Sequence, residues 1–218
     1  MKWWLELLFN RSSIFAILDR FSYQFVRVFF GSVWKVELGL RGVRPFFGPS
    51  MHIVGRPMVA MAAGSAINIG ENVILMSSSR YCLSASLYAV CKIQTLRGSA
   101  SIKIESGVSL NGTSIVCRST SVQIGARTMI GPNVSITDSP FHPTWPPLVR
   151  NIYPGTELDQ PVEIGDDVWV CSQVIILPGS RIGSGSVIAA GSVVRGEIPG
   201  NCLAAGSPAR VIRYFEGV

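Results

Sequence analysis

The sequence predicts an all-β solenoid, a parallel β-helix of hexapeptide repeats that follows a helical N-terminal segment. Three observations predict this fold. Aliphatic residues recur at every sixth position over a long stretch of the chain. Small residues, glycine among them, fill most of the positions between these aliphatics. The first fifty residues lack both features and follow helical spacing instead.

Residues 1–50 form the first predicted unit, a helical segment that is both apolar and basic. Its large apolar side chains recur at steps of three and four, at Ile14, Leu18, Phe21, Phe25, Phe29 and Val33. Asp19, Arg20 and Arg27 interrupt the apolar run before it reaches the length of a bilayer span, and we expect no cleaved signal peptide. Two interpretations stay open: the segment caps the first coil of the solenoid, or it lies in a membrane interface.

Residues 51–200 form the predicted β-helix. The clearest ladder consists of Ile164, Val170, Ile176, Ile182, Ile188 and Val194. A helix turns about 100° per residue, so a spacing of six would scatter these side chains over three directions. One long strand would repeat every second residue. The spacing therefore predicts short strands and turns in alternation, with one large side chain per strand pointing inward.

A weaker ladder precedes this one. Its rungs are Ile104, Leu110, Val116 and Val122, followed after a two-residue step by Ile124, Ile130 and Ile136. The sequence thus predicts Val116 as an inward-facing residue. An ordinary β-sandwich would show period two with irregular spacing between strands, which fits these residues less well.

The repeat is broken conspicuously once, at residues 137–160, which we interpret as an excursion loop. Five prolines forbid regular strand pairing there, at positions 140, 143, 146, 147 and 154. The loop contains His142, one of two histidines in the chain. Histidine is well suited to take a proton from a hydroxyl near neutral pH. Asp138, at the root of the loop, is predicted to fix the tautomer of the His142 ring.

The amino-acid composition limits the kinds of binding partner that we expect. Only 15% of residues are charged and 48% are hydrophobic, which predicts burial in an oligomer or contact with a membrane. The formal charge of +6 comes from scattered residues without interleaved aromatics in the repeat, so nucleic acid is not expected as a partner. The cysteines are odd in number and lack CxxC spacing, which predicts reduced core residues of a cytoplasmic protein: Cys82, Cys91, Cys117, Cys171 and Cys202.

Two stretches carry a family resemblance. "VEIGDDVWVCSQVIILPGSRIGSGSVIAAGSVVRGEIPGNCLAAGSPARVIR" resembles the C-terminal signature of the hexapeptide-repeat, or left-handed β-helix, acyltransferases. "DSPFHP" resembles the catalytic histidine loop of that family, especially in bacterial O-acetyltransferases of surface polysaccharides. The resemblance implies left-handed coils, a homotrimer, acetyl-CoA bound in a groove between subunits, and no required metal. It also implies direct transfer with His142 as the general base.

The same resemblance implies further site residues. Trp169, Ser172 and Ala190 would line the acyl and pantetheine end of the cofactor. Arg195, Arg210 and Arg213 would meet its phosphates, the last two within a C-terminal tail at residues 201–218. Asn111, and Trp145 in the excursion loop, are the candidates for acceptor binding. The family usually carries Thr-Lys where this chain has Arg195 and Gly196, so the phosphate contact would pass to Arg195.

The predicted function is therefore O-acetylation of a bacterial surface polysaccharide or of its sugar precursor, in the cytoplasm or peripherally at the inner face of its membrane. A γ-class carbonic anhydrase shares the scaffold but needs three histidines, and the chain has two. A sugar nucleotidyltransferase would need an additional α/β domain. Two alternatives stay open: an acetyltransferase for a small sugar or antibiotic, and a noncatalytic scaffold that binds CoA or a partner.

Overall fold

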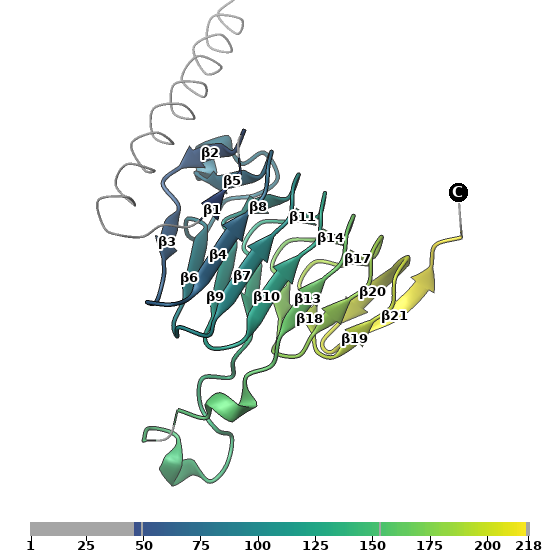
Figure 1. Ribbon diagram of the computed structural model, residues 1–218. Coiled ribbons are helices and arrows are strands. Elements are labelled where there is room, and N and C mark those ends of the chain that lie inside the picture. The colour runs from purple at the N-terminus through teal and green to yellow at the C-terminus, as the bar shows by residue number, and fades with distance from the viewer. Residues whose placement is uncertain (1–45, 49, 153, 217–218) are drawn as a thin grey trace, which may run out of the picture.

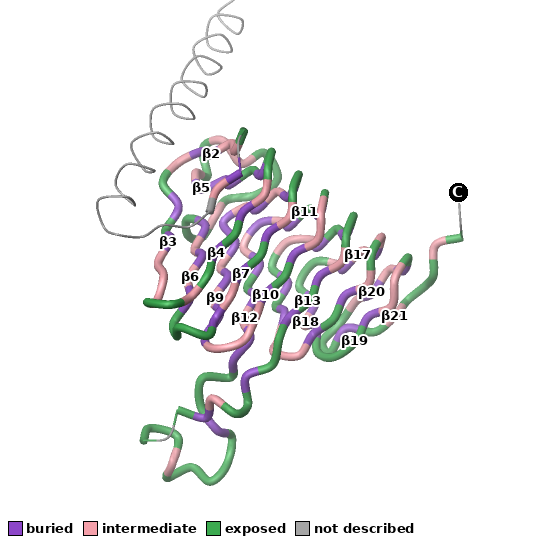
Figure 2. Tube along the Cα trace, viewed as in Figure 1, coloured by how far each residue is buried: buried purple, intermediate pink, exposed green. Residues whose placement is uncertain are grey.

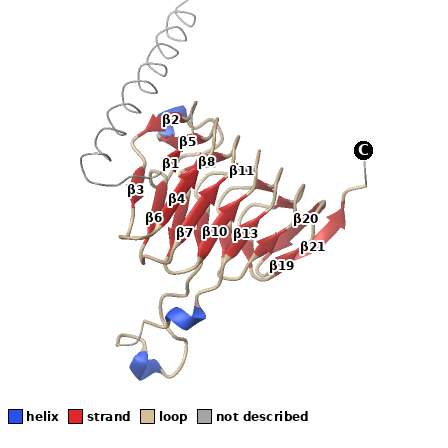
Figure 3. Cartoon of the chain, in the orientation of Figure 1, coloured by secondary structure: helices blue, strands red, loops and turns tan. Residues whose placement is uncertain are grey.

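The computed structural model of the protein shows a stack of triangular coils with one long loop projecting from it (Figure 1). The structure describes residues 46–216 except 49 and 153. The helical segment predicted for residues 1–50 therefore lies, up to residue 45, outside the described residues. Almost all regular structure in the described part is β-strand, with three short 3-10 helices (Figure 3).

Each coil except the last contributes one strand to each of three sheets, which we call sheets A, B and C. Sheet A contains β1 (Phe46–Phe47), β4 (Ala66–Ile69), β7 (Ser101–Ile104), β10 (Ser121–Ile124), β13 (Val162–Ile164), β16 (Arg181–Ile182) and β19 (Glu197–Ile198). Sheet B contains β2 (His52–Gly55), β5 (Ile74–Ser77), β8 (Ser109–Asn111), β11 (Met129–Ile130), β14 (Trp169–Val170), β17 (Val187–Ile188), β20 (Cys202–Gly206) and β21 (Ala209–Tyr214). Sheet C contains β3 (Met58–Ala60), β6 (Lys92–Thr95), β9 (Ser114–Cys117), β12 (Ser135–Thr137), β15 (Ile175–Ile176) and β18 (Val193–Val194).

The coils stack in parallel register, which places like positions of successive repeats above one another. Ile104 lies beside Ile124, which lies beside Ile164, and the same holds for Leu110, Ile130 and Val170. The six predicted rungs from Ile164 to Val194 are each at most 3% exposed. Figure 2 shows these buried positions repeating from coil to coil. The all-β solenoid and its period-six core are confirmed.

The weaker ladder contains one wrong prediction. Ile115, not Val116, is the fully buried rung of β9, and it lies beside Ile136 in the next coil. The corner between β8 and β9 holds only Gly112 and Thr113, whereas the equivalent corner of the next coil holds four residues. Because the coil is one residue shorter there, the inward position moves from residue 116 to residue 115.

An insertion that the sequence analysis did not predict lies over this shortened corner. It joins β5 to β6 and includes the 3-10 helix η1 (Ser79–Tyr81). The side-chain amide of Asn133 accepts a hydrogen bond from the backbone N–H of Tyr88 at 2.8 Å, and Gln173 contacts the Tyr88 hydroxyl at 2.5 Å. A Cβ atom at Gly112 would meet the carbonyl oxygen of Ala89 at 2.9 Å. Glycine at this corner thus lets the insertion pack closely.

The strands extend beyond the predicted repeat, 51–200, at both ends. β1 precedes residue 51 and pairs with β4. β20, within the predicted tail at 201–218, pairs in parallel with β17, and β21 folds back antiparallel on β20. The end strands depart from the spacing of six, because β1 has only two residues whereas β20 and β21 have five and six residues and form an antiparallel pair.

Replacement of Ile115 and of Val116 by asparagine should have opposite outcomes. Ile115→Asn places an amide without partners in the core and removes packing, so we expect a loss of roughly 3 kcal/mol or more. Val116→Asn on the same strand points outward and should lower the melting temperature much less. Thermal unfolding followed by circular dichroism compares the two variants. A larger loss for Val116→Asn would restore the strict period of six.

Candidate active site

The excursion loop leaves the coils after β12 and rejoins them at β13, at the corner between sheets C and A (Figure 1). It includes the 3-10 helices η2 (Pro147–Val149) and η3 (Thr156–Leu158). Figure 2 shows that the loop is mostly exposed except near its root. Since parallel strands resume in register on either side, the loop is an addition to a corner and leaves the core continuous.

Asp138 anchors the root of this loop. Its side chain is buried, with Oδ1 accepting the backbone N–H of Arg118 at 2.6 Å and Oδ2 accepting that of Thr120 at 2.8 Å. Oδ2 also accepts the backbone N–H of Ser119 at 3.1 Å and the Thr120 hydroxyl at 2.9 Å. The carboxylate thus fastens the loop to the preceding coil.

The Cys117 thiol completes this group of donors. Burial, together with the charge of Asp138, raises the pKa of the Cys117 thiol to about 12. The thiol therefore stays protonated and lies 3.4 Å from Oδ2 of Asp138 as a weak donor. The buried carboxylate of Asp138 is thus surrounded by hydrogen-bond donors, as a buried polar group requires.

His142 takes its orientation from a different group. Its Nδ1 lies 2.6 Å from the carbonyl oxygen of Arg150, on the same loop. A carbonyl oxygen only accepts, so Nδ1 carries the proton and Nε2 presents its lone pair. The ring is exposed. The prediction that Asp138 fixes the tautomer of His142 is wrong. Asp138 is directed into the root of the loop, and the Arg150 carbonyl oxygen accepts the hydrogen bond from His142 Nδ1 instead.

Arg118 and Asp159 form a buried ion pair at the root of the loop. They are 6% and 8% exposed. Arg118 Nε lies 2.8 Å from Oδ2 of Asp159, and Nη2 lies 2.5 Å from Oδ1. The same guanidinium donates to three carbonyl oxygens of the loop: Phe141 at 2.9 Å, Gly155 at 2.7 Å, and Pro154.

The pKa of Asp159 reflects this environment. Burial by itself raises the pKa of the Asp159 carboxyl group. Hydrogen bonds from Arg118, Ser119 and Ser139, with the positive charge of Arg118, outweigh burial and hold the pKa below its usual value. The Asp159 carboxyl group is therefore ionised throughout the neutral pH range.

Three predicted cofactor residues lie on or beside sheet B. Trp169 points outward from β14 and is 49% exposed. Ser172 and Ala190 occupy equivalent corners, between sheets B and C, of adjacent coils. The Ser172 carbonyl oxygen accepts the backbone N–H of Gly191 at 3.0 Å. The structure thus brings Ser172 and Ala190 together at one corner, as a cofactor lying along that corner would require.

Cys171 lies beside Ser172 and is the nearest thiol to this corner in sequence. Burial raises the pKa of the Cys171 thiol, and a hydrogen bond with the backbone of Ala190 only partly offsets this. The thiolate is the nucleophilic form of cysteine, and this environment disfavours it.

The three predicted phosphate-binding arginines do not form one group. Arg195 and Arg210 line a hollow of about 550 Å³, together with Leu177, Val193, Gly196, Ser207 and Pro208. Arg213 lies further along β21, with its guanidinium 5.5 Å from the centre of the Phe215 ring. Arg195 and Arg210 are therefore the pair that the structure places together.

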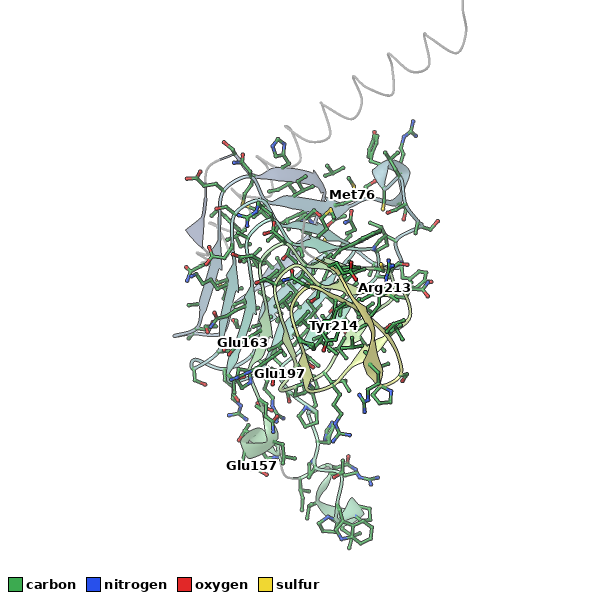
Figure 4. All side chains as sticks on the ribbon, turned by 90° about the vertical axis from the view of Figure 1, so that its right-hand side faces the viewer. Met76, Glu157, Glu163, Glu197, Arg213 and Tyr214 are labelled. Atoms are coloured by element: carbon green, nitrogen blue, oxygen red, sulfur yellow. The ribbon has the colours of Figure 1, made fainter. Side chains whose placement is uncertain are left out.

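The predicted acceptor residues lie on separate parts of the chain. Asn111 ends β8 in sheet B, where its amide nitrogen donates to the carbonyl oxygen of Ile130 at 2.8 Å. It lines a hollow of about 760 Å³ beside the insertion that follows β5. Trp145 is 77% exposed on the excursion loop. Asn111 pairs with Met76, which Figure 4 shows on the far side of the coils from that loop.

Comparison with known proteins identifies the repeat. Residues 161–196 match the family model described as bacterial transferase hexapeptide (six repeats). This stretch of the chain is therefore similar to the hexapeptide-repeat transferases. The resemblance predicted from its C-terminal half is thereby confirmed.

Several relatives of this hexapeptide-repeat protein are O-acetyltransferases by name. Galactoside O-acetyltransferase of Lactococcus lactis is 38% identical over 119 residues, or 55% of this chain and 56% of that protein. Galactoside O-acetyltransferase of Escherichia coli is 45% identical over 95 residues, or 44% of this chain and 45% of that protein. WbbJ of Escherichia coli, provisionally named a lipopolysaccharide biosynthesis O-acetyl transferase, is 43% identical over 101 residues, or 44% and 52%. The chain thus spans about half the length of these relatives.

Two solved structures share the fold. A mutant of AntD, an N-acyltransferase from Bacillus cereus in complex with dTDP-4-amino-4,6-dideoxyglucose and coenzyme A, has a TM-score of 0.60 at 17% identity, covering 83% of this chain and 90% of that chain. The polysialic acid O-acetyltransferase OatWY has a TM-score of 0.56 at 18% identity, with coverage of 78% and 83%. In the described part of the hexapeptide-repeat chain, no group of three or more His, Cys, Asp or Glu side chains is arranged to hold a metal ion.

Sequence reasoning missed Arg118, Ser119 and Asp159. A signal existed, because Arg118 follows Cys117 in the coil directly before the one from which the loop departs. The register of β9 and β12 pairs Val116 with Thr137, and the next residues, Cys117 and Asp138, contact each other through their side chains. The predicted inward position of Val116 shifts the pairing of β9 with β12 by one residue, and this shift conceals the contact.

The low pKa of Asp159 predicts a specific loss of stability in acid. A carboxyl group with a lowered pKa in the folded state stabilises the fold above its unfolded pKa, about 3.9, and loses this contribution as pH falls through the folded value. The wild-type melting temperature should therefore drop below about pH 4. Asp159→Asn should be less stable at pH 7 and show a shallower decline in acid.

Asp167→Asn provides the matched control, because Asp167 pairs with Arg127 on the exposed surface. Its pKa is also lowered by Arg127, but solvent screens this pair. Thermal melts of wild type, Asp159→Asn and Asp167→Asn between pH 2 and 7 measure how steeply each melting temperature declines in acid. Equal slopes for Asp159→Asn and wild type would contradict the interpretation.

Proposed function

We propose that this protein transfers an acetyl group from acetyl-CoA to a hydroxyl of a bacterial surface polysaccharide or its sugar precursor. The observation that carries the proposal is the hydrogen bond between His142 Nδ1 and the Arg150 carbonyl oxygen. It leaves Nε2 as a base on an exposed loop at the break in a hexapeptide-repeat solenoid. The names of the relatives and the coenzyme A complex of AntD support the cofactor and the reaction class.

The reaction requires no acyl-enzyme. His142 Nε2 removes the proton from the acceptor hydroxyl as its oxygen attacks the thioester carbonyl carbon of acetyl-CoA. The tetrahedral intermediate collapses with cleavage of the C–S bond, and the imidazolium returns its proton to the CoA sulfur. Ser172, at the corner beside Trp169, is the proposed contact for the oxygen that becomes negative.

We propose that the site is completed by a second copy of the chain. Within one chain, His142 projects from the corner between sheets C and A, while Ser172 and Ala190 lie at the corner between sheets B and C. In a homotrimer, the loop of one subunit would reach the cofactor corner of the next. Left-handed winding of the coils, which the family resemblance implies, belongs to the same proposal.

The surface of the coils supports this assembly. Sheet A presents a charged row, in which Figure 4 shows Glu163 and Glu197 on one flank. Sheets B and C expose apolar side chains instead, including Met129 and Trp169 on one and Ile175 on the other. Exposed apolar side chains of this kind are typical of faces that are buried between subunits.

Small sugars are the second candidate acceptors. The two galactoside O-acetyltransferases among the relatives favour them, whereas the name of WbbJ favours a polysaccharide precursor. A transfer screen with acetyl-CoA against oligosaccharides, simple galactosides and antibiotics, read by mass spectrometry, separates these acceptors. Binding of CoA without any product would support a noncatalytic scaffold instead.

His142→Ala should lower kcat by about 10²-fold or more, because a positioned general base contributes that much. Affinity for CoA should stay close to that of wild type. His52→Ala, which alters the other histidine of the chain on β2, is the matched control and should retain activity. Steady-state kinetics and calorimetric titration with CoA measure both quantities. Unchanged turnover in His142→Ala would remove this residue from the mechanism.

We further propose that the N-terminal segment brings the enzyme to an anionic membrane surface. Residues 1–45 lie outside the described residues, and the described part contains no helix suited by length and apolarity to span a bilayer. The sequence supplies Arg11, Arg20, Arg27 and Lys35, each worth about 1 kcal/mol near an anionic leaflet.

The full chain should therefore co-sediment with vesicles containing phosphatidylserine and not with neutral vesicles. Removal of residues 1–36 should abolish this binding and leave turnover of a short soluble acceptor intact. Aggregation of the truncated chain, without vesicle binding by the full chain, would favour a cap on the first coil.

A further inference from the structure

The residue that precedes His142 is held in an unusual backbone conformation. Phe141 has φ = +64°, and the backbone N–H of His142 donates to the carbonyl oxygen of Pro140 at 2.8 Å. A hydrogen bond from residue i+2 to residue i around a central residue of positive φ is the pattern of the rare, strained γ-turn. For a bulky residue such as phenylalanine this conformation persists only where its surroundings enforce it.

The surroundings of Phe141 do enforce it. Its backbone N–H donates to the Ser139 hydroxyl oxygen at 2.8 Å. Its carbonyl oxygen accepts from Arg118 Nη1 at 2.9 Å. Its ring lies under the same guanidinium, 5.7 Å from Arg118 Cζ to the ring centre. Arg118 thus contacts Phe141 both through its backbone oxygen and through its ring.

Arg118 is itself fixed by the body of the solenoid. It follows β9 directly, and its backbone N–H is held by Asp138. Its guanidinium is oriented by the bidentate pair with Asp159 and by the carbonyl oxygens of Pro154 and Gly155. The two limbs of the excursion loop, one on each side of its tip, therefore meet on one buried side chain.

We propose that Arg118 is the positioning residue for His142: it holds Phe141 in the γ-turn and so directs the neighbouring imidazole toward the Arg150 carbonyl oxygen. Arg118 does not touch the reacting atoms in this arrangement. Because Arg118 is fixed in the coils and contacts Phe141, it restricts the orientation of a ring that is otherwise exposed on a long loop. The proposal rests on the proposed role of His142 as the base, but the placement of the ring can be tested without any turnover.

Three variants provide the test. Arg118→Met keeps the apolar stem and removes every donor. Arg118→Lys keeps the charge but lacks the planar fork that reaches several acceptors at once. Arg127→Met is the matched control, because Arg127 makes a bidentate pair with Asp167 at 2.7 and 2.6 Å, on the exposed surface.

The tautomer of His142 is the readout independent of activity. Ring nitrogen shifts of histidine-labelled protein at pH 8 distinguish Nδ1–H from Nε2–H, and His52→Ala and His142→Ala assign the two rings. We expect Nδ1–H in wild type and in Arg127→Met. In Arg118→Met and Arg118→Lys the ring should revert toward Nε2–H, the form that predominates in free histidine. Cleavage by trypsin after Arg150, which is exposed on the loop, should accelerate in the same two variants.

Kinetics then separate positioning from binding. In Arg118→Met and Arg118→Lys, kcat should fall about 10²-fold while KM for acetyl-CoA stays near the wild-type value, because a small displacement of a catalytic group has this effect. If Arg118→Met fails to fold, Arg118→Lys decides the result. An unchanged Nδ1–H signal and unchanged kcat in the folded variants would overturn the proposal. A wild-type protein that shows the Nδ1–H signal but no acetyl transfer would instead refute the proposed function.

Discussion

Register between successive coils is the constraint on which the rest of the structure depends. Each strand satisfies its backbone groups only against the coils above and below it, and a slip of one residue in the pairing of a strand would turn its inward side chains outward. Ile102, Val122 and Val162 illustrate the requirement, because they occupy one inward position in three successive coils. Additional residues are therefore accommodated where strands end. Both long additions, after β5 and after β12, lie at corners.

This constraint also explains why the root of the excursion loop is so polar. Where the chain departs at residue 138, the turn at residues 118–120 in the preceding coil presents backbone donors that a carboxylate can satisfy, and Asp138 does so. The same turn supplies Arg118, which binds both limbs of the loop. Polar groups inside a protein are stable only when they are paired. The pairing at the root thus gives a proline-rich surface loop a defined orientation relative to the core.

Sequence could predict the parts of the fold that repeat. Six residues from Ile164 to Val194 share one spacing, and each is buried as that spacing requires. Periodicity misplaces Val116 because the coil is one residue shorter between β8 and β9 than in its neighbour, a local event that the repeat itself cannot reveal. His142 was recognised from its place at the break in the repeat. Its hydrogen-bond partner could not be predicted, because the partner is the backbone carbonyl of Arg150. Every residue type supplies such a carbonyl, so the sequence does not mark this position.

The antiparallel return of β21 on β20 has a consequence for the last coil of the stack. A stack of identical coils presents open strand edges at its last turn, and such edges are templates for adding further strands. Here sheets A and C end at β19 and β18, while sheet B continues by one strand that runs in the opposite direction. The last turn is thereby uneven and of mixed polarity. A second solenoid cannot continue all three sheets from it, and growth into a fibre by end-to-end addition is disfavoured.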